Sequence, residues 1–514
     1  MIFLGLILSN LIYLTRVGDK MLKIIIDNNK CRLENIGLSL FKRITRELTF
    51  KIPGAEFSNK YRSGQWKGTY EFFKRNISLV GLLPIIINII NEYEVPYEII
   101  DKRKSVMTLN KIDYNYKLTT KVLRDYQVDA ANSILENYIG NCYFPRGIIH
   151  LATNGGKTVI SEAIMNEILK CVDYDKIILF IVPTQEVAFQ TEQNFKTEFP
   201  EITIGFIGAG IWRTGRIIIA LVPTLYKNLK NKRFLEITEK TCSIVIDEVQ
   251  HASSNTYKKV LENFDNAFIR IGLTGTIPKD EIKKHMIYGL VGVPSIHIRN
   301  EFLIKQQASA KPLCYFIEIR EPRIYAHDYM QVYSEGIVNN VVRNNAIVII
   351  TKLERLLNHN ILILVDRVEH GEILRNMISK MNIGVLEFTN GSRKTKDRKI
   401  ILDKLKQGKI NILIATTVLD EGVDADNINA IIYARGQISP RKLLQGLGRG
   451  LRKKKDNSTL HFYDFFDFTH KDLTKHTLDR YNTLKTENFE IKELNITKLK
   501  ELIDDAENNK KTNY

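Results

Sequence analysis

Gly155-Gly156-Lys157-Thr158 is the segment of this sequence best suited to bind phosphate. It follows the apolar run Gly147–Leu151 and precedes a helical pattern from Val159 to Leu169. In that context, backbone N–H groups can surround phosphate oxygens at a helix N-terminus, while Lys157 supplies a positive charge and Thr158 can bind Mg²⁺. We therefore predict a phosphate-binding loop with ATP and Mg²⁺ as cofactors. Its predicted nucleotide-contacting residues are Leu151, Ala152, Thr153, Asn154, Gly155, Gly156, Lys157 and Thr158.

Two adjacent carboxylates, Asp247 and Glu248, follow the apolar run Cys242–Ile246. At the carboxyl edge of a parallel sheet, where ligands bind, Asp247 can hold the Mg²⁺ shell and Glu248 can orient and deprotonate a water. An isolated Asp-Glu pair is more often a helix cap, and an isolated Gly-Gly-Lys-Thr is common in loops. The two motifs in this order favour a catalytic site that contains Lys157, Asp247 and Glu248.

The order of motifs across residues 121–452 resembles that of superfamily 2 helicases. Leu123–Gln127 resembles the family's adenine-recognising segment, which implies nucleotide contacts by Arg124 and Gln127. Gly272–Thr276 resembles the motif that couples ATP to nucleic acid. Asn154 stands where related helicases often have glycine, so we expect the loop backbone to differ in detail.

Further segments complete the resemblance. They are Val182–Glu186 and Val222–Thr224, similar to strand-contacting turns, and Ala415–Asp424 and Gln445–Arg452, similar to the fifth and sixth motifs. The resemblance implies nucleic-acid contacts by Thr184, Gln185, Thr224 and Thr416, and nucleotide contacts by Gln250, Gly422 and Asp424.

Arg449 and Arg452 lie three residues apart, on one face of a predicted helix. A guanidinium there can act as an arginine finger that neutralises charge on the transferring phosphoryl group. Lys453–Lys455 follow directly, so a basic surface helix is the alternative. Gln445 and Gly448 at the family's spacing favour catalytic roles for both arginines.

The candidate catalytic and nucleotide-binding residues must be positioned by the surrounding strands and helices. The sequence contains apolar runs without polar alternation, and helical patterns separate these runs. Such runs indicate parallel strands covered on both faces. The runs are Gly147–Leu151, Lys176–Val182, Arg216–Leu221, Cys242–Ile246, Ile269–Leu273, Asn360–Val365, Ile383–Phe388, Asn411–Ala415 and Ala430–Ala434. The predicted fold class is α/β, with two tandem RecA-like parallel-sheet domains and a small N-terminal α+β domain.

We divide the chain by composition and pattern. Residues 1–20 are a doubtful extension without the flanks of a signal peptide, and 21–105 form an accessory nucleic-acid-binding domain that we expect to be separable. Residues 106–300 form the ATP-binding domain, 301–470 the helicase C-terminal domain, and 471–514 a charged C-terminal tail that we expect to fray from about Lys485.

Composition indicates a polyanionic partner. The formal net charge is +17, and five cysteines lie far apart without zinc-ligand spacing. We therefore expect nucleic acid rather than a membrane, and reduced thiols in a cytoplasmic protein, in the host cytoplasm if the protein is viral.

Basic and aromatic residues interleave from Asn59 to Arg75, a pattern that can grip phosphates and stack on bases. We predict nucleic-acid contacts by Lys60, Arg62, Trp66 and Lys67. In the alternative interpretation, Trp66, Tyr70, Phe72 and Phe73 are the core of a small domain. The stretch resembles the accessory domain of UvsW-type phage helicases.

The predicted function is ATP-dependent translocation on duplex or branched DNA, with no membrane and with unknown protein partners. The box Asp247–His251 is closer to DNA translocases than to RNA-unwinding relatives, and Gln250 with His251 would couple the nucleotide to Gly272–Thr276. The alternative for His251 is a buried histidine with satisfied hydrogen bonds. An RNA helicase, an ATP-switched DNA clamp and a restriction-type motor subunit are the alternatives.

Overall fold

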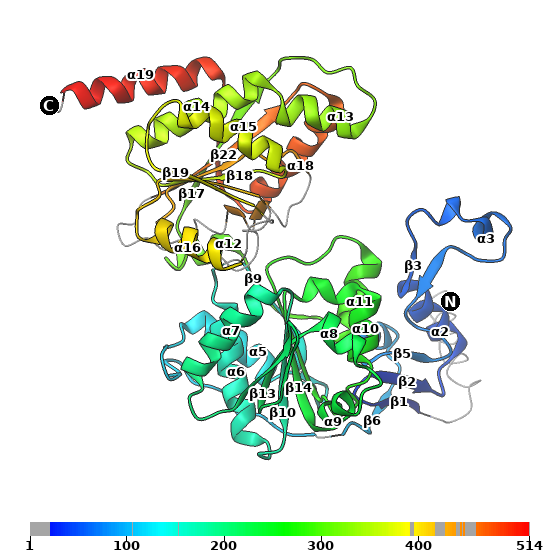
Figure 1. Cartoon of the computed structure of the whole chain (residues 1–514). Coiled ribbons are helices and arrows are strands. Elements are labelled where there is room, and N and C mark those ends of the chain that lie inside the picture. Colours follow the sequence, from blue (N-terminus) through cyan, green and yellow to red (C-terminus); the bar gives the residue numbers. More distant parts are fainter. Residues whose placement is uncertain are drawn as a thin grey trace, which may run out of the picture. The chain divides into compact units, whose positions relative to one another are not determined.

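The computed structural model describes residues 21–104, 106–152, 154–390, 395–416, 427–437 and 459–512, with Leu443, Leu444, Gly446 and Leu447. The chain forms two compact units (Figure 1). Unit 1 extends to His297 and unit 2 begins at Ile298, except that Ala152–Gly155 group with unit 2. Among the described residues, no helix is both long enough and apolar enough to cross a membrane.

Unit 1 begins with the predicted small α+β domain. Its sheet has the order β5-β2-β1-β6, in which β1 pairs antiparallel with β2 and parallel with β6. Apolar residues at every second position of β1 are buried, as expected for a strand with one covered face. The elements are β1 Leu22–Ile26, β2 Lys30–Glu34, α2 Leu38–Glu47, β3 Thr49–Lys51, η1 Ala55–Phe57, α3 Asn59–Arg62, β4 Thr69–Glu71, β5 Ile77–Leu79, η2 Val80–Leu82, α4 Leu83–Glu92 and β6 Tyr97–Asp101.

The first motor sheet follows in unit 1, with the order β12-β11-β13-β10-β14-β15-β9-β16 among the described strands. Figure 1 shows α5, α6 and α7 on one face and α8, α10 and α11 on the other. The elements are α5 Asp125–Leu135, β7 Tyr138–Ile139, β8 Cys142–Tyr143, β9 Arg146–Leu151, α6 Lys157–Cys171, β10 Ile177–Val182, α7 Gln185–Glu198, β11 Ile204–Gly208, β12 Ile211–Arg213, β13 Ile217–Leu221, α8 Val222–Lys227, α9 Lys232–Lys240, β14 Thr241–Asp247, η3 Val249–Ser253, α10 Asn255–Leu261, β15 Ile269–Thr274, α11 Glu281–Leu290 and β16 Pro294–Ile298.

Strand β15 lies between β9 and β14 and runs parallel to both. The loops after these three strands therefore emerge at the same edge of the sheet. This order brings together the ends of three motifs that are far apart in the sequence. Each apolar run predicted as a strand in this region forms one, whereas β7, β8, β11, β12 and β16 were not predicted.

The small domain and the first motor sheet share one hydrophobic core, which argues against the expectation that the small domain is separable. A Cβ added at Gly81 would lie 2.1 Å from the carbonyl oxygen of Tyr288, and one added at Gly289 would lie 2.6 Å from Leu79. The backbones thus approach as closely as glycine permits. A single cluster of buried side chains runs from β1 and α4 to α10 and α11.

Two buried arginines of the motor sheet bind the turn between β1 and β2. Arg146 Nη2 donates to the carbonyl oxygen of Asn28 (2.7 Å), and Arg270 Nη2 donates to Asn29 Oδ1 (2.5 Å). Asn29 Nδ2 in turn donates to Asp265 Oδ1 (2.5 Å). Without residues 21–104 these guanidinium groups would lose buried acceptors, at a cost of about 1–3 kcal/mol for each unsatisfied group.

Unit 2 contains the second motor sheet, with the order β19-β20-β18-β21-β22-β17-β23 and parallel pairing between neighbours among the described strands. Separate hydrophobic clusters cover its two faces. The elements are α12 Asn300–Lys305, β17 Pro312–Ile319, α13 Tyr329–Tyr333, η4 Ser334–Val338, α14 Val341–Leu356, β18 Ile361–Leu364, α15 Val368–Ser379, β19 Leu386–Thr389, α16 Thr395–Lys406, β20 Ile412–Ala415, β21 Ala430–Tyr433, β22 Leu460–Asp467, α18 Lys471–Thr486, β23 Glu490–Leu494 and α19 Ile496–Thr512.

The expectation of a charged tail from residue 471 is wrong. Strand β23 pairs in parallel with β17, and Leu499 and Ile503 of α19 are buried against α14. The segment is rich in Lys, Glu and Asn, and only a few apolar residues mark its buried face. Those residues pack on the second sheet, so the segment is part of the fold and is not a fraying end.

Candidate active site

The phosphate-binding loop joins β9 to α6 as predicted. Helix α6 begins at Lys157, and its N-cap is Gly156, which has φ +88° and makes no side-chain cap hydrogen bond. The N–H groups of the first turn are therefore not taken by a cap, as a phosphate site requires. Asn154, which replaces a common glycine, has φ +69°, a conformation that Asn tolerates better than most residues. The backbone at this position is therefore left-handed, a conformation that glycine, the common residue here, adopts readily.

Lys157 and Glu248 meet at the edge of the sheet. Lys157 Nζ lies 3.6 Å from Glu248 Oε1, and both side chains are partly exposed (16% and 19%). Glu248 directly follows β14, has φ +50°, and donates its backbone N–H to Asp247 Oδ1 (3.0 Å). The strained backbone turns Glu248 out of the strand direction and toward the loop after β9.

Gln250 connects the acidic pair to the loop after β15. Gln250 Nε2 donates to Glu248 Oε2, and Thr274 Oγ1 lies 2.5 Å from Gln250 Oε1, which can accept its proton. The backbone N–H of Thr276 donates to Thr274 Oγ1 (3.0 Å). A continuous polar chain therefore runs from Lys157 through Glu248 and Gln250 to Thr274. The sequence predicted coupling to Gly272–Thr276 through Gln250 and His251. Gln250 lies in this chain, His251 is half-buried, and Thr274 was not singled out as the end point.

Gln127 lies beside the same loop. Its Oε1 accepts from the backbone N–H of Arg124 (2.9 Å), and its Nε2 would lie 2.2 Å from a Cβ added at Gly156. Only glycine leaves room for the amide there. The predicted adenine-reading residue is thus packed against the phosphate loop, and Arg124 donates to the hydroxyl of Tyr126 (3.3 Å).

These residues fit Mg²⁺ and ATP. The uncapped helix end and Lys157 suit phosphate oxygens, while Thr158 and Asp247 offer the oxygen ligands that Mg²⁺ prefers. Bound Mg²⁺ would neutralise phosphate charge. Predictions for Thr153, Gly422, Asp424, Arg449 and Arg452 lie outside the described residues.

The predicted strand-contacting turns lie next to each other in unit 1. Thr184 precedes α7 and accepts from the N–H of Val187 (3.3 Å), and Gln185 is exposed. Thr224 is half-buried in α8, which follows β13, the parallel neighbour of β10. In unit 2, Thr416 is 4% exposed, so its side chain is not at the surface.

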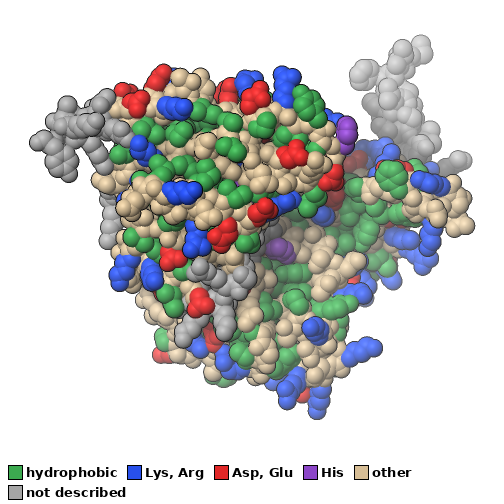
Figure 2. All heavy atoms as spheres, turned by 45° about the horizontal axis from the view of Figure 1, so that its top comes forward, with side chains coloured by type: hydrophobic (Ala, Val, Ile, Leu, Met, Phe, Trp, Pro, Cys, Tyr) green, Lys and Arg blue, Asp and Glu red, His purple; other side chains and the backbone are tan. Residues whose placement is uncertain are grey.

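An arm, residues 52–68, projects between β3 and β4 (Figure 1). Lys60, Arg62 and Lys67 are exposed on it, and Trp66 is half-buried. Figure 2 shows blue Lys and Arg side chains on this arm at the right of the view.

The aromatic residues of this region divide between core and surface. Phe72 and Phe73 are buried, as in the core interpretation. Phe57 and Tyr61 on the arm are 72% and 43% exposed, and sequence reasoning did not single them out. Their position between basic residues was the available signal.

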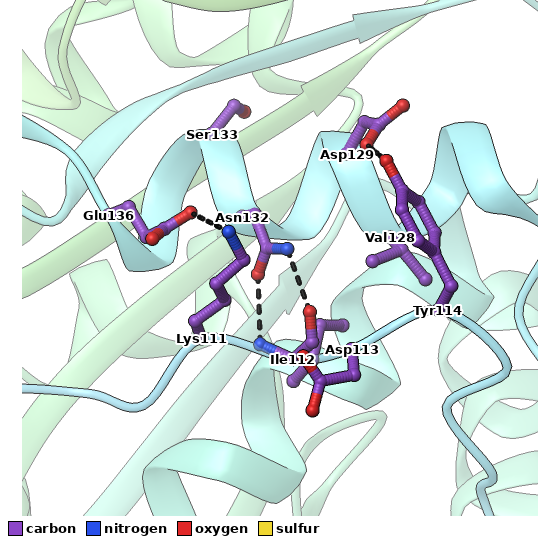
Figure 3. A pocket seen from close by; sticks show the side chains of 9 residues that line it. All are labelled: Lys111, Ile112, Asp113, Tyr114, Val128, Asp129, Asn132, Ser133 and Glu136. Carbon is purple, nitrogen blue, oxygen red and sulfur yellow. Dashed lines mark hydrogen bonds and ion pairs between the residues drawn. The ribbon is translucent and has the colours of Figure 1, made fainter.

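A separate cavity of about 440 Å³ lies along α5 (Figure 3). Tyr114 donates its hydroxyl to Asp129 Oδ1 (2.9 Å) across it, and Asn132 binds the backbone of Ile112 through both amide atoms. The lining residues are Lys111, Ile112, Asp113, Tyr114, Val128, Asp129, Asn132, Ser133 and Glu136. None of them is a predicted nucleotide contact.

Comparisons with known proteins agree with this geometry. Residues 120–279 match the family described as type III restriction enzyme, res subunit, and residues 345–454 match the helicase conserved C-terminal domain. The chain is therefore an ATP-hydrolysing enzyme of the superfamily 2 helicase class, with two RecA-like domains.

Within that class, the chain resembles UvsW-type phage helicases. It is 21% identical over 490 residues to the ATP-dependent DNA helicase uvsW of Enterobacteria phage T4, covering 88% of this chain and 94% of that protein. A protein of Sulfolobus islandicus filamentous virus that is named as a helicase is 25% identical over 467 residues, 86% of this chain and 79% of that one. The structure of the DUF1998 helicase MrfA bound to DNA shares the fold, with TM-score 0.55, 14% identity and 74% and 52% coverage.

Proposed function

We propose that this helicase moves on duplex or branched DNA and remodels forks or junctions by branch migration. The observation that carries the proposal is the basic arm. Lys60, Arg62 and Lys67 are exposed together, and the domain that bears them shares its core with the first motor sheet. Basic side chains on a packed domain can bind phosphates without the entropy cost of ordering a flexible segment.

The arm is organised by its own hydrogen bonds. Arg62 Nε donates to the carbonyl oxygen of Glu56 (3.2 Å), and the N–H of Trp66 donates to the carbonyl oxygen of Lys60 (3.1 Å). A Cβ at Gly68 would lie 2.7 Å from the ring of Tyr61, so this ring packs on the returning strand. These contacts hold the basic side chains near one another, which favours a defined DNA surface over a loose tail.

In this proposal, Lys157 and the N–H groups of α6 bind the phosphates, and Glu248 orients and deprotonates the attacking water. Gln250 transmits the state of Glu248 to Thr274 and the loop after β15. DNA is preferred to RNA because the sequence Asp-Glu-Val-Gln-His differs from the RNA-unwinding form, and because uvsW is named as a DNA helicase.

The first test compares ATP hydrolysis with single-stranded DNA, duplex DNA, a four-way junction and RNA. We expect the strongest stimulation by duplex or junction DNA, and ATP-dependent movement of the branch point in a labelled junction. Stimulation by RNA alone would identify an RNA helicase. Hydrolysis with no branch movement would identify a switch or clamp.

The second test changes the arm. Replacing Lys60, Arg62 and Lys67 by alanine should weaken junction binding and flatten its salt dependence, by about 0.9 in slope for each lost phosphate contact. Alanine at Lys232, Arg233 and Lys240 is the matched control. All three residues are exposed, and their replacement removes the same amount of charge from α9. Because α9 precedes β14, it lies at the edge of the first motor sheet opposite the loops after β9, β14 and β15. Equal salt slopes in the two variants would exclude the arm from DNA binding.

A further inference from the structure

Glu354, His359 and His461 form a cluster in unit 2 that the ATP site does not include. Glu354 is in the last turn of α14 and fully buried, whereas the side chains of His359 and His461 are 22% and 20% exposed. One ligand atom from each residue lies within 4.8 Å of the others. The histidines therefore form the solvent side of the cluster, and the carboxylate forms its floor.

The backbone holds these three residues in place. Asn358 has φ +58° and donates its N–H to the carbonyl oxygen of Arg355, while the N–H of His359 donates to that of Glu354 (2.9 Å). This pair of bonds is the Schellman motif, which fixes the chain direction at the end of a helix. His461 lies in β22, paired with β17 and β21, so its position is fixed independently.

Both histidines direct the same ring atom at the carboxylate. His359 Nδ1 is 2.6 Å from Glu354 Oε2, and His461 Nδ1 is 2.9 Å from Glu354 Oε1. Tyr463, two residues along β22 from His461, donates its hydroxyl to Glu354 Oε1 (2.6 Å). The carboxylate is thus oriented by a group outside the two histidines, as metal-binding carboxylates usually are.

The charge of Glu354 lacks a permanent counterion. Among the described residues, both ion pairs of Glu354 are with these histidines, and none is with Lys or Arg. A buried carboxylate is normally paired with a charge or bound to a metal ion.

We propose that Glu354, His359 and His461 bind one divalent transition-metal ion, with Zn²⁺ the best match. Two imidazoles and one carboxylate, with an exposed side for a water ligand, are a typical zinc set. With metal–ligand bonds of about 2.0–2.1 Å in a tetrahedron, donor atoms lie roughly 3.3 Å apart and imidazole centres roughly 5 Å apart. The ring centres of His359 and His461 are 5.3 Å apart, close to the spacing that a tetrahedral ion needs, and one ligand atom from each residue already lies within 4.8 Å of the others.

Metal binding requires a change of tautomer. Each Nδ1 now faces an acceptor oxygen and so carries a proton. The lone pair of Nδ1 becomes available when that proton resides on Nε2 instead. The bound ion would then link the end of α14 and its loop to β22, at the amino edge of the second sheet. Stabilisation of unit 2 is the expected consequence of this link.

The experiment uses the full-length, nucleotide-free protein after chelator treatment. Titration with Zn²⁺ should show saturable binding at one site that His359→Gln and His461→Gln each weaken by about tenfold or more. Co²⁺ should give the visible absorption of a tetrahedral site in the wild-type protein and not in these variants. Saturating Zn²⁺ should raise the wild-type melting temperature by about 5 °C.

His327→Gln is the matched control, because His327 is exposed and outside the cluster. It should bind Zn²⁺ as the wild type does. The proposal is overturned if His359→Gln and His461→Gln bind Zn²⁺ with wild-type affinity, or if the wild type shows no saturable site. These assays do not depend on DNA or ATP, so they stand apart from the proposed function.

Discussion

Lys157 Nζ lies 3.6 Å from Glu248 Oε1, although the two residues belong to loops after different strands. Lys157, the predicted phosphate-binding cation, and Glu248, the predicted general base, therefore form an ion pair at the edge of the first motor sheet. A bound phosphate would compete for Lys157 and release Glu248 to act on water. Hydrolysis would thus be linked to nucleotide binding within unit 1 itself.

Lys157→Ala should reduce the rate of ATP hydrolysis by on the order of 10² or more, because the charge that contacts the phosphates is lost. The fold should be retained, since the side chain is partly exposed. The measurement is steady-state hydrolysis with DNA present, alongside the melting temperature. Lys170→Ala, on the same helix, is the control and should hydrolyse ATP normally. Retained DNA-stimulated turnover in Lys157→Ala would place the site elsewhere.

Glu248→Gln should keep ATP binding and lose hydrolysis by about 10²–10⁴, because an amide cannot accept the proton of the attacking water. The amide oxygen can still accept from Gln250 Nε2, so the local structure should persist. Nucleotide affinity by fluorescence and single-turnover hydrolysis test this. A normal rate would mean that the general base is another residue.

Gln250→Leu and Thr274→Val should each reduce DNA stimulation more than basal hydrolysis, because they break the same polar chain at different points. The two changes should be less than additive in a double-mutant cycle, as expected for residues in contact. The measurement is the ratio of hydrolysis rates with and without duplex DNA. Fully additive effects on that ratio would show that the chain does not carry the coupling.

Arg449→Ala and Arg452→Ala together should lower turnover by roughly 10³ while nucleotide affinity changes little, as expected for an arginine finger. This prediction rests on the sequence motif alone. Lys453→Ala with Lys454→Ala removes the same charge from the adjacent basic run and serves as the control. If both pairs reduce the rate equally, the arginines act through general charge and not at the phosphate.

Asn29→Ala should destabilise unit 1, because Arg270 and Asp265 both lose a buried partner. The expected cost is about 1–3 kcal/mol, or a fall in melting temperature of roughly 2–10 °C. Asn59→Ala, at an exposed position of the arm, should have no such effect. Deletion of residues 1–104 should yield unfolded or aggregated protein. A soluble truncated chain with wild-type hydrolysis would refute the shared core.

Local sequence determined most of the candidate ATP site. Lys157 and Thr158 can be placed because a strand end, a glycine pair and a helix start occur within a dozen residues. Uniform apolar runs indicate parallel strands, whichever strands they pair with. Asp247 and Glu248 could be assigned for the same reason, because their chemistry depends on a position directly after a strand.

Only tertiary structure decided the features that join distant segments. The contact between Gln250 and Thr274 depends on β15 lying between β9 and β14, and strand order is not encoded in periodicity. Buried hydrogen bonds from Arg146 and Arg270 to Asn28 and Asn29 attach the small domain to the first motor sheet. Nothing in the local sequence distinguishes these polar residues from others. Likewise, Glu354 and His461 are 107 residues apart, and only the packing of α14 against the second sheet brings their side chains to 2.9 Å. Such contacts arise from the burial of whole faces, which no short stretch of sequence specifies.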